Sequence, residues 1–67
     1  MNIITNNLDR HEAQYVKNIV ANSKDLLEVY NAIKTLGLDD SLIHLGSNHV
    51  SVLDTKTGHE TVKIVTP

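Results

Sequence analysis

The 67-residue sequence contains no cysteine, which excludes disulfide bonds and metal centres held by thiolate ligands. This absence suits a reducing compartment and argues against a secreted scaffold stapled by disulfides. Phenylalanine and tryptophan are also missing, and the only two tyrosines are Tyr15 and Tyr30. The core must therefore be aliphatic, and the chain lacks the stacking platforms on which binders of single-stranded nucleic acid rely.

Neither sign of charge dominates, because six Lys and Arg residues stand against eight Asp and Glu residues, for a net charge of −2. Domains that bind nucleic acid usually carry a basic excess, so this balance argues against a polyanionic partner. The first residues lack the basic region and apolar run of a signal peptide, and no stretch approaches the roughly 18 apolar residues of a membrane helix. The sequence therefore predicts a cytoplasmic protein without a membrane partner.

The small size of the chain limits its core. We expect a single domain over residues 1–67. A domain of this size buries only about 60% of its unfolded surface, and its core alone supplies roughly 3–5 kcal/mol. With disulfides excluded, a second copy of the chain or a protein partner remains as the common source of further stability.

The hydrophobic period changes near Gly37. Before it, apolar residues recur at helical spacing and predict two amphipathic helices, over residues 9–21 and 24–36. The short break between them makes the pair an antiparallel helical hairpin. Asn7 or Asp9 is expected to cap the first helix and Asn22 or Ser23 the second, with Gly37 as the left-handed residue that ends it.

After Gly37 the apolar residues alternate and predict short strands, with turn signals over residues 46–48 and 54–58. A two-residue turn at Gly46 and Ser47, with glycine at positive φ, aligns Ile43 with Val50.

A three-residue loop over residues 56–58, with Gly58 left-handed, pairs Thr55 with His59. In that register Val50 faces Ile64 and Val52 faces Val62, so four aliphatic residues share one face.

These elements predict an α+β fold, in which an N-terminal helical hairpin packs on one face of a small antiparallel sheet of two to three strands. The polar segment over residues 1–7 contains Ile3 and Ile4, and the pattern leaves open whether it forms a brief edge strand or a frayed end.

The face of the sheet turned away from the helices is the predicted partner-binding surface. Leu53 and Leu42 would form an apolar patch there among polar residues, which is typical of a protein-interaction site. The candidate partner-binding residues are Leu42, His44, His49, Ser51, Leu53 and Lys63.

The four histidines are weak candidates for a metal site. His44 and His49 would face each other across the sheet, but two imidazoles supply only half of a four-ligand zinc site. The acidic pair Asp39 and Asp40 lacks the regular spacing of a calcium loop. We therefore expect no bound metal and no cofactor.

Catalysis is not expected either. Ser41 with His44, or Ser51 with His49, forms a pair of the kind that any small protein contains by chance. The sequence has no phosphate-binding glycine loop and no nucleophile or zinc-protease motif. We predict neither enzymatic activity nor a small-molecule substrate.

The main alternative to protein binding is a dimeric nucleic-acid-binding or transcriptional accessory protein built on a helix–turn–helix. Its candidate residues are Arg10, Lys17 and Lys24, whose basic strip is diluted by neighbouring acids. The preferred hypothesis is a non-catalytic regulatory or inhibitory module that binds another protein or a second copy of itself. Small chains without cysteines or motifs are common among accessory proteins of bacteria and their phages.

Overall fold

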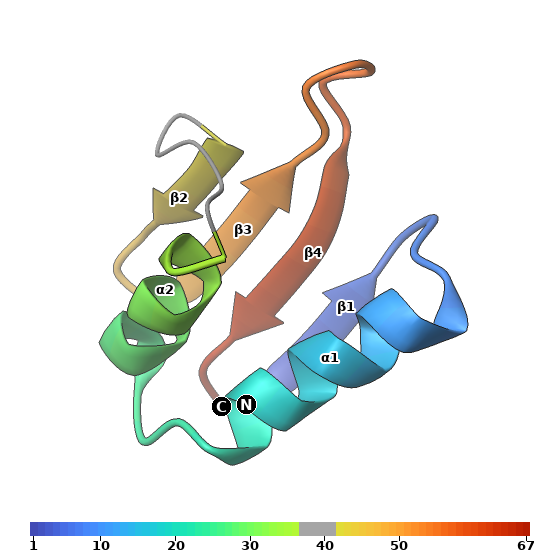
Figure 1. The fold of residues 1–67 in the computed structure, drawn as a ribbon. Helices are drawn as coiled ribbons and strands as arrows, with labels where there is room; N and C mark the ends of the chain where they lie inside the picture. Colours follow the sequence, from blue (N-terminus) through green and yellow to red (C-terminus); the bar gives the residue numbers. More distant parts are fainter. Residues whose placement is uncertain (37–41) are drawn as a thin grey trace.

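The computed structural model describes residues 1–36 and 42–67. Figure 1 shows two helices lying on one face of an antiparallel sheet. The elements in chain order are β1 (Asn2–Thr5), α1 (Arg10–Ala21), α2 (Leu26–Lys34), β2 (Ile43–Leu45), β3 (His49–Leu53) and β4 (Glu60–Val65). The predicted α+β fold with a helical hairpin is confirmed. Gly37, Asp39, Asp40 and Ser41, which carry predictions above, lie outside the described residues.

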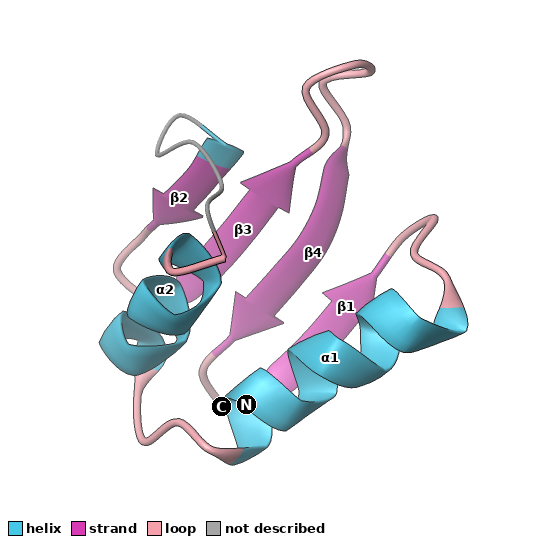
Figure 2. Ribbon diagram, viewed as in Figure 1, coloured by secondary structure: helices cyan, strands magenta, loops and turns pink. Residues whose placement is uncertain are grey.

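The sheet has four strands in the order β1-β4-β3-β2, with every neighbouring pair antiparallel (Figure 2). It is wider than the predicted two to three strands because the N-terminal segment joins it. Ile3 pairs with Ile64, and the ladder continues as far as Asn6, whose N–H donates to the Thr61 carbonyl at 2.9 Å. The segment left open by the sequence is thus an edge strand, and β4 is central.

Helix α1 begins as the sequence predicts. The Asp9 carboxylate accepts the Glu12 N–H at 2.8 Å, and the Glu12 carboxylate accepts the Asp9 N–H at 3.3 Å. This reciprocal capping box satisfies two backbone donors that the helix itself leaves free. Asn7 takes a left-handed conformation, with φ of 63°, in the turn that precedes the cap.

The predicted cap of the second helix is wrong. Asp25 caps α2, with its carboxylate accepting the Glu28 N–H at 2.9 Å. The predicted caps Asn22 and Ser23 instead donate side-chain hydrogen bonds of 2.8 and 2.6 Å to carbonyl groups in the last turn of α1. They finish the first helix rather than start the second, because the last carbonyls of a helix also need partners.

The core lies between α2 and the middle of the sheet. Among the described residues, seven buried apolar side chains come from α2, β2, β3 and β4, and none comes from α1. They are Leu26, Val29, Ile33, Ile43, Val50, Val62 and Ile64.

The β3–β4 hairpin keeps the predicted pairing of Val50 with Ile64 and of Val52 with Val62. Gly58 has the predicted positive φ, at 73°.

The predicted pairing of Thr55 with His59 is wrong. The Asp54 N–H donates to the His59 carbonyl at 2.8 Å, and the Asp54 carboxylate accepts the Lys56 N–H at 2.7 Å. The longer loop is accommodated by a register shift between Val52 and Leu53, beyond which Leu53 pairs with Glu60.

The β2–β3 turn also differs from the prediction. Ile43 pairs with Val52 rather than Val50, and the Gly46 N–H donates to the His49 carbonyl at 2.8 Å, so the turn is centred on residues 47 and 48. Gly46 does not have a positive φ. It lies against the His49 ring, so a Cβ atom at this position would require the ring to move. The register moves by two residues, so Ile43 keeps its place on the buried face.

Candidate functional site

Four of the six predicted partner-binding residues lie together on the face of the sheet that the helices leave open. His44 pairs with Ser51, which pairs with Lys63, and these three form one row across the strands. His49 lies on the same face, two residues before Ser51. Ser51 is buried even so, with only 5% of its surface exposed.

The two histidines of this face are close but do not face each other as predicted. The displaced turn puts His44 opposite Ser51, and the His44 and His49 rings lie diagonally, with centroids 5.7 Å apart. Within the part of the chain that the structure describes, no three His, Cys, Asp or Glu side chains are grouped closely enough to hold a metal ion.

Leu42 and Leu53 differ in position from the other four residues. The prediction places them in an outward apolar patch on the open face. In the structure both line a hollow of about 850 Å³ on the side of the sheet that carries the helices. The predicted set is therefore divided between two surfaces, a polar row on the open face and an apolar hollow between the helices.

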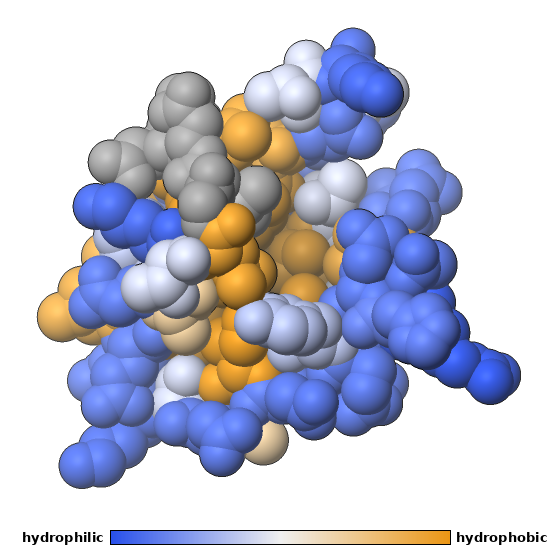
Figure 3. Space-filling view, viewed as in Figure 1, coloured by the Kyte–Doolittle hydropathy of each residue, from blue (hydrophilic) through white to orange (hydrophobic). Residues whose placement is uncertain are grey.

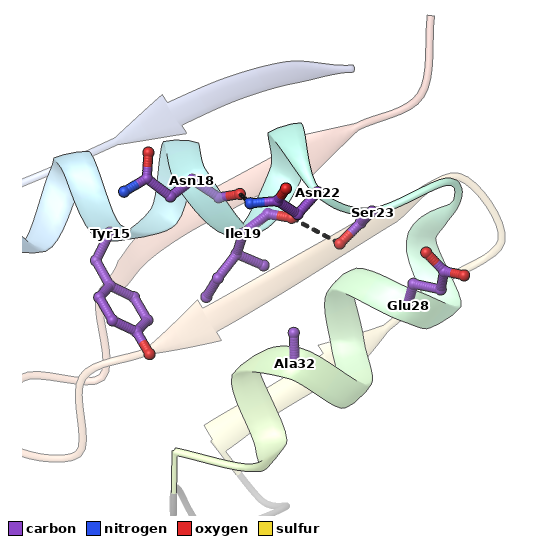
Figure 4. A pocket seen from close by; sticks show the side chains of 7 residues that line it. All are labelled: Tyr15, Asn18, Ile19, Asn22, Ser23, Glu28 and Ala32. Atoms are coloured by element: carbon purple, nitrogen blue, oxygen red, sulfur yellow. Dashed lines mark hydrogen bonds between the residues drawn. The ribbon is translucent and has the colours of Figure 1, made fainter.

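This hollow is bounded by α1, by the end of α2 and by the β3–β4 hairpin. A second hollow, of about 490 Å³, lies where α1 meets α2, and both are lined by Tyr15 and Ile19. Figure 4 shows these two side chains extending from α1, and Ala32 from α2, toward the same space. We call the two hollows together the interhelical groove.

The floor and walls of the interhelical groove are largely apolar. Figure 3 shows an apolar strip running between the polar outer surfaces of the two helices. Several of these side chains are well exposed: Tyr15 by 51%, Leu36 by 49% and Leu53 by 37%. The principal apolar residues of the groove are Leu8, Tyr15, Val16, Leu36, Leu42 and Leu53.

The charges around the groove have one sign. Its lining includes the carboxylates of Glu12, Asp54 and Glu60, and among its described lining residues there is neither Lys nor Arg. His11 and His59 also line its larger hollow. An apolar channel with acidic sides complements an apolar segment that is flanked by basic residues.

The three basic residues of the nucleic-acid alternative lie elsewhere. Arg10 and Lys17 are exposed on α1, two turns apart, and Lys24 lies in the connection to α2. None of them lines the groove. Glu12 lies on the same turn as Arg10, and the Glu28 carboxylate accepts the Lys24 N–H at 2.7 Å, so acids accompany the strip as predicted.

Neither of the two described helices is long and apolar enough to cross a membrane. Comparison of the chain with protein-family models, curated proteins and solved structures found no match.

The sequence interpretation did not include the α1 residues His11, Glu12, Tyr15 and Val16 in any site. Tyr15 and Val16 belong to the apolar stripe of an amphipathic helix, which indicates only the side of the helix that faces the protein. Nothing in that periodicity indicates how completely the stripe is covered.

Proposed function

We propose that this protein is a non-catalytic regulatory or inhibitory module that acts by binding another protein through the interhelical groove. The main support for this proposal is the incomplete burial of α1. This amphipathic helix has no buried residue, and its apolar stripe, which contacts the core only through half-buried side chains, borders an open groove. Large exposed apolar surfaces of this kind are typical of protein-interaction sites.

The chemistry of the groove defines the class of partner. Its apolar lining favours aliphatic or aromatic side chains, and its acidic sides favour Lys or Arg next to them. The matching ligand is an amphipathic segment of a protein, with apolar anchors at helical spacing and basic residues at their flanks. The absence of cysteine supports action in a reducing compartment such as the cytoplasm.

Selection from a display library of random peptides tests this proposal. Peptides enriched on the immobilised protein are expected to combine apolar anchors with Lys or Arg, and their affinity should fall as salt rises. Leu53→Asp places a charge in the apolar lining and should weaken binding at least tenfold. The control is Leu27→Gln, because Leu27 is exposed on α2 but does not line the groove.

NMR titration of a selected peptide then locates the binding surface. Shifts should concentrate in α1, the end of α2 and the β3–β4 hairpin. Peptides that bind Leu53→Asp as tightly as the unaltered protein, or that shift only the open sheet face, would contradict the proposal.

A further inference from the structure

Strand β1 is a short edge strand that lacks most of the features that prevent edge pairing. It lies at the end of the strand order, and its residues, Asn2–Thr5, include no charge and no proline. Its register with β4 runs without a bulge. Charged residues, prolines and bulges are the usual means by which proteins keep an edge strand from pairing with another chain.

The hydrogen bonds within the sheet identify which backbone groups face outward. The Asn6 N–H donates to the Thr61 carbonyl, so the even-numbered residues of this segment bond to β4. In an antiparallel pair the bonded residues alternate. The N–H and C=O groups of Ile3 and Thr5 are therefore directed away from β4, toward the open edge.

The side chain in the middle of this edge strand is also unusual. Ile4 is exposed by 56%, the largest value among the exposed large apolar residues of the described chain. It pairs with Lys63 and so lies on the open face of the sheet, opposite to Ile3, which packs against the core. Outward-facing backbone groups and an exposed isoleucine side chain thus occur on the same short strand.

We infer that β1 pairs with β1 of a second copy of this chain, antiparallel and about a two-fold axis. The outward groups of Ile3 then meet those of the second copy's Thr5, and two such pairs give four hydrogen bonds by the antiparallel pattern. Ile4 falls on the axis and faces its own equivalent as a non-hydrogen-bonded pair, where side chains are closest.

A second copy supplies both features that this edge needs, an outward row of backbone groups and an apolar side chain opposite Ile4. One residue, Ile4, supplies both halves of the apolar contact, as an isologous two-fold interface requires. The sheet becomes continuous across the two copies, and the α1 helices, which lie over β1 in Figure 1, come to the same side of it. This inference does not depend on the interhelical groove.

The absence of cysteine allows a direct test by cross-linking. Residues in a non-hydrogen-bonded antiparallel pair have Cα atoms about 4.5 Å apart, within the range that a disulfide spans. Ile4→Cys should therefore form a covalent dimer on mild oxidation. The matched control is Asn2→Cys, which is exposed on the same face of β1 but faces residue 6 of the second copy. It should cross-link at least tenfold less.

Light scattering across a concentration series measures the assembly without a cross-link. The unaltered protein should dimerise, and Thr5→Pro should raise the dissociation constant at least tenfold because it removes an outward N–H. Proline is tolerated on an edge strand where its nitrogen faces away from the sheet, so the monomer should keep its circular dichroism spectrum. Thr5→Val retains the N–H and should dimerise normally.

A monomer at every concentration would overturn the inference, as would a dimer that Thr5→Pro leaves intact. Equal cross-linking of the two cysteine variants would also overturn it. Leu53→Asp, which alters the groove, should still dimerise, so failure of the groove proposal and failure of this one are distinguishable.

Discussion

The two helices have similar apolar stripes but differ in how deeply these stripes are buried. Helix α2 buries Leu26, Val29 and Ile33 against the sheet, whereas α1 buries no residue. The apolar residues of α1 that contact the core, Val16, Ile19 and Val20, are only half-buried. An amphipathic pattern therefore specifies which side of a helix faces the protein but leaves its degree of burial undetermined.

The sheet explains the difference. Helix α2 packs against β2 and β3, whose inward residues include Ile43 and Val50, both buried. Figure 1 shows α1 on the other side, over β1. That strand supplies only Ile3 to the core. The half of the molecule that contains α2 is thus closely packed, whereas in the other half α1 borders an open groove.

The largest contrast is expected from truncating one isoleucine in each helix. Ile33→Ala in α2 removes a side chain that is 3% exposed, and such changes cost about 2–5 kcal/mol. Ile19→Ala in α1 removes a half-buried side chain and should cost about 1 kcal/mol. Urea denaturation followed by circular dichroism measures both values. Equal losses would show that α1 is as firmly packed as α2.

Removing the N-cap of each helix should have a smaller effect on stability than the isoleucine truncations, and the two helices should respond differently. Asp25→Ala and Asp9→Ala each delete a capping acceptor, at a typical cost of about 1 kcal/mol. Because α2 is part of the core, Asp25→Ala should lower the global free energy of unfolding. Asp9→Ala should mainly increase local opening of α1.

Amide hydrogen exchange distinguishes these two responses. Faster exchange confined to α1 is expected for Asp9→Ala, with Asp9→Asn as the control because asparagine retains the acceptor. Uniformly faster exchange in both variants would remove the distinction between the two halves.

The smallest effect on stability is expected at two exposed side chains. Tyr15→Gln in α1 and Leu27→Gln in α2 alter residues exposed by 51% and 55%, and each should change the free energy of unfolding by less than about 0.5 kcal/mol. Only Tyr15 lines the groove. Tyr15→Gln should therefore weaken peptide binding while Leu27→Gln does not, as calorimetry of a selected peptide would measure.

The sequence predicts the α+β class, the helical hairpin and the pairing of β3 with β4, because these depend on local periodicity. It misplaces the β2–β3 turn because Gly46 suggests a positive φ, whereas Gly46 has no positive φ in the structure and lies against the His49 ring. It misassigns the cap of α2 because Ser23 and Asp25 are both good caps, and the bond from Ser23 to the end of α1 decides between them.

The candidate site is less accessible to prediction than the fold. The sequence predicts Leu42 and Leu53 on the open face of the sheet, whereas both line the groove on the helical side. Their position depends on the end of the sheet and on the register shift beside Leu53. The position of Ile4 on an edge strand depends on β1 pairing with a strand some sixty residues later in the chain. The positions of these residues depend on pairing between distant strands, which a local sequence pattern does not reveal.

The position of β4 also constrains when the molecule can form during synthesis. This strand is the last element along the chain, yet it joins β1 to β3 and supplies Val62 and Ile64 to the core. Strand β1 leaves the ribosome before the other three strands and has no strand beside it until β4 follows. The complete four-stranded sheet therefore assembles only after β4 has emerged, and ribosome-bound chains that stop before Glu60 expose an incomplete core to chaperones and proteases.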